Sequence, residues 1–132
     1  MQLSMSIAAI SLGAIVGANA RWALGLLLNG YFPNLPLGTL AANLIGAFII
    51  GLMVPTFVAI PSVFWRLFII TGFLGALTTF STFSAEIFDA LQGGRLFWAI
   101  TGILVHVGGS LAMTWLGAVL FLVLRQFLGG AR

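Results

Sequence analysis

Thr78-Thr79-Phe80-Ser81-Thr82-Phe83-Ser84 is a hydroxyl-rich stretch that lies inside a long apolar run of this chain. It places five hydroxyl groups beside two phenyl rings. Such residues are a poor choice for a helix that faces lipid, because an unpaired polar group in hydrocarbon costs several kcal/mol. We therefore expect this stretch to face another helix, water or an ion.

The composition around this stretch is that of a membrane protein. Of 132 residues, 61% are hydrophobic and only 5% are charged, against about 25% in soluble domains. So few charges cannot coat a water-facing surface, which predicts an integral membrane protein. The charged residues are five arginines and two acids that form no basic patch, which argues against nucleic-acid binding. The chain has no cysteine, which excludes disulfides and thiolate metal sites.

Apolar segments long enough to cross a bilayer, at about 20 residues each, occur four times. They are Ser4–Leu28, Leu37–Val58, Ser62–Leu91 and Leu96–Phe127. Turn-forming Gly, Pro and Asn residues separate them. The first segment lacks the positively charged start of a signal peptide, so we interpret it as a retained transmembrane helix. Residues 1–132 are predicted to form a single all-α domain of four transmembrane helices, with both ends on the same side of the membrane.

Small residues recur at helical spacing within these segments. Gly13 and Gly17 form a G-x-x-x-G pattern, and Gly38, Ala42 and Gly46 share one face of the second helix. Small residues let membrane helices approach closely. The pattern favours a compact bundle and says little about function.

The arginines are divided almost evenly between the two sides of the membrane. Arg66, Arg125 and Arg132 lie on one side, and Arg95 lies on the other, together with Arg21 if it reaches its nearer interface. An excess of Arg and Lys sets the orientation of a membrane protein, so this division is a weak signal. Two interpretations stay open: a single orientation set weakly by the C-terminal arginines, or insertion both ways with antiparallel pairing of two copies.

The hydroxyl-rich stretch also carries two phenyl rings at a suggestive spacing. Phe80 and Phe83 project from one face of a helix, where two such rings commonly serve only packing. Gly72 and Gly75, followed by consecutive Thr, favour a break in the middle of the third helix. A break frees backbone carbonyls that must be buried or bind an ion. Because the edge of an aromatic ring is positive, the two rings can offer a small anion the weak, multi-site attraction that conduction requires.

Polar residues on two other helices line up at helical spacing. Thr39 and Asn43 are one turn apart on the second helix, and His106, Ser110 and Thr114 form a stripe on the fourth. Each alone is explained by an interhelical hydrogen bond worth about 1 kcal/mol or less. Together with the hydroxyl groups of the third helix, they predict a polar file across the membrane.

Charged residues within the spans are scarce. Arg21 at mid-membrane would cost about 2.5–3.5 kcal/mol. It either extends to the interface or forms a wet, positive entrance for anions, with Glu86 as its hydrogen-bonding partner. Asp89, near the third loop, is expected to be solvated. One His, no Cys and two acids near one helix end supply neither a catalytic set nor a metal cluster, so we expect no enzyme activity.

Three motifs connect the glycines, the polar residues and the hydroxyl-rich stretch. They are Gly13-x-x-x-Gly17-x-x-x-Arg21-Trp22, Gly38-Thr39-Leu40-x-x-Asn43-x-x-Gly46, and Gly72-x-x-Gly75-x-x-Thr78-Thr79-Phe80-Ser81-Thr82-Phe83. Together they closely resemble the Fluc/CrcB family of microbial fluoride ion channels. The third motif is the most specific, and the resemblance in length and four-helix layout covers essentially the whole chain. His106 stands where some members have Tyr, and Trp22 stands where Tyr is frequent.

This resemblance implies an antiparallel, dual-topology homodimer with two fluoride pores. The residues it places in the pore are Phe80, Phe83, Asn43, Ser81, Thr82, Ser110 and Thr114. The residues it places in the vestibule are Arg21, Thr39 and Glu86. It further implies a structural sodium ion (Na+) at the centre of the dimer interface, bound at the break in the third helix by the backbone carbonyls of Gly75 and Thr78.

The function expected from the residues and the resemblance together is passive, fluoride-selective export by an ion channel of the inner (plasma) membrane. Its partners would be fluoride, membrane lipid and a second copy of itself. Two alternatives stay open on the residues alone. One is a small proton-coupled exporter, which usually needs an acid at the membrane midplane, whereas Glu86 lies nearer a helix end. The other is a structural membrane subunit without transport activity.

Overall fold

Apolar runs bounded by turn residues fold into long helices in this protein. The computed structural model describes residues 2–59 and 61–129, so Arg132, counted above on one side of the membrane, lies outside the described residues. Four spans are long and apolar enough to cross a membrane. They are Leu3–Leu28, Leu37–Ala59, Val63–Gln92 and Leu96–Phe127. The four predicted segments are confirmed, and the described residues contain no strand.

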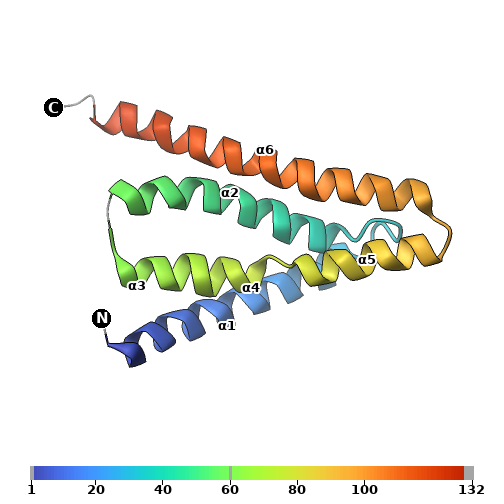
Figure 1. Cartoon of the computed structure of the whole chain (residues 1–132), viewed down its shortest axis with the longest axis horizontal. Helices are drawn as coiled ribbons and strands as arrows, with labels where there is room; N and C mark the ends of the chain where they lie inside the picture. Colours follow the sequence, from blue (N-terminus) through green and yellow to red (C-terminus); the bar gives the residue numbers. More distant parts are fainter. Residues whose placement is uncertain (1, 60, 130–132) are drawn as a thin grey trace.

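The spans lie side by side in an up-and-down bundle (Figure 1). The first, second and fourth spans are single helices, α1 (Leu3–Leu28), α2 (Leu37–Ala59) and α6 (Leu96–Gly129). The beginning of α1 and the end of α6 lie at the same end of the bundle (Figure 1), as an even number of spans requires. The most extensive contacts join α2 to α6 and α1 to the third span.

The third span is built from several helical pieces. α3 (Val63–Arg66) continues into a π-helical stretch, η1 (Leu67–Leu74), and then into α4 (Gly75–Leu77). Two extended residues follow, Thr78 with φ/ψ of −76°/154° and Thr79 with φ/ψ of −150°/113°. The last piece is α5 (Phe80–Gln92).

Threonine hydroxyl groups form local hydrogen bonds on both sides of the interruption. Thr78 Oγ1 donates to the Leu74 carbonyl oxygen at 2.8 Å, one turn back in η1. Thr79 Oγ1 accepts from the Thr82 N–H at 3.1 Å and so caps the N-terminus of α5. The Leu74 carbonyl oxygen also accepts from the Thr78 N–H at 3.0 Å, so helical hydrogen bonding reaches Thr78. The capped N-terminus of α5 fixes where helical geometry resumes.

Glycines make the closest contacts between the spans. A Cβ atom on Gly17 of α1 would overlap the Phe73 carbonyl oxygen of η1, and one on Gly13 would overlap the Phe68 carbonyl oxygen. Gly51 of α2 is packed equally closely against the backbone of α6. The small residues therefore lie where helix backbones meet, as the spacing predicts.

Gly17→Ala is expected to destabilise the protein by about 1–3 kcal/mol, because the added methyl group overpacks the contact between α1 and η1. Gly108→Ala in α6 is the matched control, since a Cβ atom there has no neighbour within 4 Å. Denaturation midpoints in detergent, followed by tryptophan fluorescence, compare the two variants with the wild type. Equal midpoints for both variants would contradict the close approach of α1 to η1.

Candidate functional site

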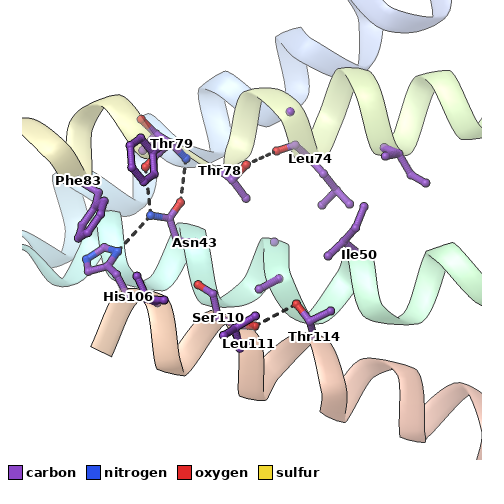
Figure 2. Close-up of a pocket in the computed structure, with 16 residues that line it drawn as sticks. Asn43, Ile50, Leu74, Thr78, Thr79, Phe83, His106, Ser110, Leu111 and Thr114 are labelled. Atoms are coloured by element: carbon purple, nitrogen blue, oxygen red, sulfur yellow. Dashed lines mark hydrogen bonds between the residues drawn. The ribbon is translucent and has the colours of Figure 1, made fainter. Parts of the chain in front are cut away.

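A groove of about 530 Å³ lies between α2, the third span and α6 (Figure 2). Its polar lining residues are Asn43, Thr78, Thr79, His106, Ser110 and Thr114. Phe80 and Phe83 line it as well, among aliphatic side chains. The hydroxyl-rich stretch and the polar residues of the second and fourth spans thus meet in one place. Of the residues predicted to form a pore, only Ser81 and Thr82 are outside this groove.

The Asn43 side chain holds the extended part of the third span. Its Oδ1 accepts from the Thr79 N–H at 2.8 Å, and its Nδ2 donates to the Thr79 carbonyl at 3.1 Å (Figure 2). Both backbone groups of Thr79 are thereby paired, although Thr79 is not helical. Unpaired backbone groups are costly inside a membrane protein, so Asn43 satisfies a requirement that the interruption itself creates.

His106 lies on the other side of the Asn43 amide. Its Nδ1 is 3.1 Å from Asn43 Nδ2. The imidazole is 4% exposed and stacks on the Phe83 ring, with centroids 4.6 Å apart and an interplanar angle of 30°. Sequence reasoning grouped His106 with the stripe of the fourth span but assigned it no partner, because no pattern relates residues 63 positions apart.

The two phenylalanines have different surroundings. Phe83 is 7% exposed against His106, whereas Phe80 is 77% exposed. Their rings nevertheless touch edge to face, with centroids 5.5 Å apart and an interplanar angle of 64°. Phe83 therefore belongs to the interior of one chain, while Phe80 presents its ring at the outer rim of the groove.

Hydroxyl groups around the start of α5 bond to one another. Thr79 Oγ1 donates to Thr82 Oγ1 at 2.9 Å and lies 3.3 Å from Ser81 Oγ. On α6, Thr114 Oγ1 donates to the Ser110 carbonyl oxygen at 2.9 Å. These groups thus have local partners, which they can exchange for a water molecule or an ion at small cost.

A second cavity of about 500 Å³ lies between α1, α2 and α5. Its polar lining residues include Arg21, Asn29, Thr39, Thr79 and Thr82. Thr79 lines both this cavity and the groove. The extended residue held by Asn43 therefore lies between the groove and the second cavity. Arg21 Nε is buried and has no hydrogen-bond partner among the described residues.

One of the two interpretations of Arg21 gave it Glu86 as a hydrogen-bonding partner, but the described residues show no bond between these two side chains. Glu86 Oε1 instead accepts from the buried Thr39 hydroxyl at 2.5 Å, because α5 presents this carboxylate to α2 rather than to α1. Asp89, expected only to be solvated, is 76% exposed but also forms an ion pair with Arg95. Neither partner could be read from the sequence, since both pairs depend on how the helices are rotated.

The interruption of the third span changes the bonding of two backbone carbonyls. In a continuous helix the Gly75 carbonyl would accept from the Thr79 N–H, but that N–H donates to Asn43. The Thr78 carbonyl would likewise accept from the Thr82 N–H, which donates to Thr79 Oγ1. No group of three or more His, Cys, Asp or Glu residues suited to a metal ion occurs among the described residues.

Comparison with known proteins identifies the family. Residues 8–118 match the family described as CrcB-like protein, Camphor Resistance (CrcB). A protein of Chromohalobacter salexigens named fluoride-specific ion channel FluC is 59% identical over 128 residues, which cover 96% of each chain. A protein of the same name from Pseudomonas putida is 57% identical over 118 residues, which cover 88% of this chain and 93% of the relative. One from Tolumonas auensis is 56% identical over 123 residues, which cover 92% and 97%. The chain therefore belongs to the CrcB family.

Proposed function

We propose that this protein is a fluoride channel through which the ion leaves the cytoplasm passively. The observation that carries the proposal is identity of 53–59% to relatives named fluoride-specific ion channel FluC. The four long apolar helices and these bacterial relatives make the chain a multi-pass protein of the plasma membrane. Hydrogen fluoride is a weak acid that enters cells as a neutral molecule and dissociates inside, so an anion pathway needs no coupled energy. We therefore assign it no catalytic activity.

Buried hydrogen-bond donors support an anion as the transported species. Two buried side-chain atoms lack a partner among the described residues, Arg21 Nε and His106 Nε2. An arginine nitrogen can only donate. His106 Nε2 also carries a hydrogen, because Nδ1 faces a donating Asn43 amide. An unpaired buried donor is costly, and an anion close to each atom would remove that cost.

The pathway supplies these groups in stages. Arg21, Thr39 and Glu86 form the vestibule: Arg21 and Thr39 line the second cavity, and Glu86 is hydrogen-bonded to Thr39. Beyond the vestibule, the residues that the family resemblance places in the pore would replace water around fluoride. They are Asn43, Phe80, Ser81, Thr82, Phe83, Ser110 and Thr114. Ring edges and hydroxyl groups attract the ion without holding it tightly, which conduction requires.

A second copy of the chain completes the site. The groove places polar side chains on a face that would otherwise meet lipid, where they could find no polar partner beyond those within the chain. The 77% exposed Phe80 lies on the same face. Pairing two copies through this face gives those groups a polar environment. The nearly even arginine distribution supports an antiparallel, dual-topology arrangement with two pathways.

We further propose that a sodium ion lies at the centre of this dimer. The Gly75 and Thr78 carbonyls have lost their usual helical N–H partners to Asn43 and Thr79, and hard cations prefer oxygen ligands. The break in the third span would thus serve as its binding site. Replacing sodium by N-methylglucamine should lower the thermal midpoint of the purified dimer, and sodium should restore it. A midpoint independent of sodium would count against the site.

Liposomes loaded with potassium fluoride test the proposed function. Once valinomycin lets potassium ions leave and so prevents a membrane potential from building up, liposomes that contain the purified protein should release fluoride. A fluoride electrode in the external solution measures the release. Liposomes loaded with potassium chloride are the control and should retain their anion. Retention of fluoride by liposomes that contain folded protein would contradict the proposal.

A further inference from the structure

One amide joins three spans at the groove. Asn43 of α2 bonds to both backbone groups of Thr79, and its remaining N–H lies 3.1 Å from His106 Nδ1 of α6 (Figure 2). The Thr79 N–H fixes which end of the amide is oxygen, since only Oδ1 can accept from it. Nδ2 therefore faces His106 and has only hydrogens to offer. His106 Nδ1 must accept, which places the hydrogen of the neutral ring on Nε2.

We propose that His106 is a positioning residue that works only as the neutral Nε2–H tautomer. It holds the Asn43 amide in the one orientation that pairs both backbone groups of Thr79. Its ring also supports the face of Phe83, at a centroid distance of 4.6 Å. The inference rests on the proposed fluoride conduction, because it concerns residues that line that pathway.

Protonation of His106 is incompatible with this arrangement. A second proton on Nδ1 would point at the Asn43 amino group, so two donors would face each other. Turning the amide around would offer Oδ1 to the imidazolium. The same rotation would place the amino group against the Thr79 N–H and Oδ1 against the Thr79 carbonyl, and both bonds to Thr79 would be lost. Conduction should therefore fall as His106 becomes protonated.

Few other ionisable groups lie near His106 and could cause a pH-dependent change in fluoride current. His106 packs against Asn43 of α2 and Phe83 of α5, and α2 contains no charged residue. The acids of α5 are Glu86, which binds Thr39, and Asp89, which pairs with Arg95. His106 is the single histidine of the chain. A change of fluoride current between about pH 5 and about pH 8, where histidine side chains change charge, can thus be traced to one residue by substitution.

His106→Gln is the matched variant for this test. Glutamine can accept from Asn43 through its oxygen and still donate through its nitrogen, but it does not titrate in this range. In planar bilayers, wild-type fluoride current should fall by up to about tenfold from about pH 8 to about pH 5, the loss expected when one ordinary hydrogen bond breaks. The current of His106→Gln should change little. Current recording counts only the anion, so neutral hydrogen fluoride crossing the lipid does not contribute.

Nitrogen-15 labelling provides a readout that does not depend on transport. With one histidine, solid-state NMR of protein in lipid shows a single imidazole. At about pH 8, the proposal requires a protonated Nε2 and an unprotonated Nδ1. The opposite tautomer would overturn it, as would a wild-type current that is unchanged at a pH where the spectrum shows both imidazole nitrogens protonated, or the same fall in His106→Gln. Absence of fluoride current in the wild type at every pH would instead contradict the proposed function, and the NMR result would still decide the tautomer.

Discussion

Fluoride efflux from liposomes should fall by about 2- to 12-fold in Phe83→Ile and in Phe80→Ile, since a favourable aromatic-edge contact is worth about 0.5–1.5 kcal/mol and about 1.4 kcal/mol is tenfold. Isoleucine keeps the apolar bulk but has no positive ring edge. The two rings touch at 5.5 Å between centroids, so replacing either one also removes an orienting contact of the other. Phe83→Ile additionally removes the surface on which His106 stacks.

Phe88→Ile is the matched control for both phenylalanine variants. Phe88 lies on the same helix, α5, and is 61% exposed, but it lines neither the groove nor the second cavity. Its efflux should equal that of the wild type. Wild-type efflux in both Phe80→Ile and Phe83→Ile would remove the aromatic rings from the pathway.

A chain locked in one orientation should carry almost no fluoride by itself. Several lysines added to the loop between α1 and α2 should hold that loop in the cytoplasm, because the balance of positive charge sets orientation. Lysines added instead after α6 should lock the opposite orientation. An antiparallel dimer needs both forms, so each locked chain alone lacks the partner that completes its groove.

Coexpression supplies the control for the locked chains. The two oppositely locked chains together should restore fluoride efflux, which would show that the added lysines do not damage the pathway. Full activity of a single locked chain would contradict the antiparallel arrangement. The same chains can be checked by crosslinking across the groove face, where a pair should form only in the coexpressed sample.

The spans could be predicted closely because bilayer thickness and turn residues both act locally. The length of each apolar segment sets the length of its helix. The helices end at connections rich in Asn and Pro (residues 29–36) or containing two glycines (residues 92–95). The π-helical geometry of Leu67–Leu74 could not be predicted, since Gly72 and Gly75 indicate only that the helix is interrupted and not which helical geometry precedes the interruption. This stretch packs closely against Gly13 and Gly17 of α1, a contact between distant segments that no local pattern reveals.

The members of the groove were more predictable than their contacts. Periodicity placed Asn43 and His106 on polar stripes of two helices, but it cannot give the rotation of one helix about another. The hydrogen bonds of Asn43 to Thr79 and His106 therefore emerged only from the structure. The same limitation applies to Glu86, which one interpretation paired with Arg21, whereas its partner is Thr39.

A planar-bilayer recording of purified protein under a fluoride gradient tests the central claim most directly. With fluoride unequal and chloride equal on the two sides, at one pH, the account predicts a current that reverses at the fluoride equilibrium potential. The current should need no pH gradient. No current, a reversal set by chloride, or fluoride movement only when a pH gradient is imposed would contradict the account.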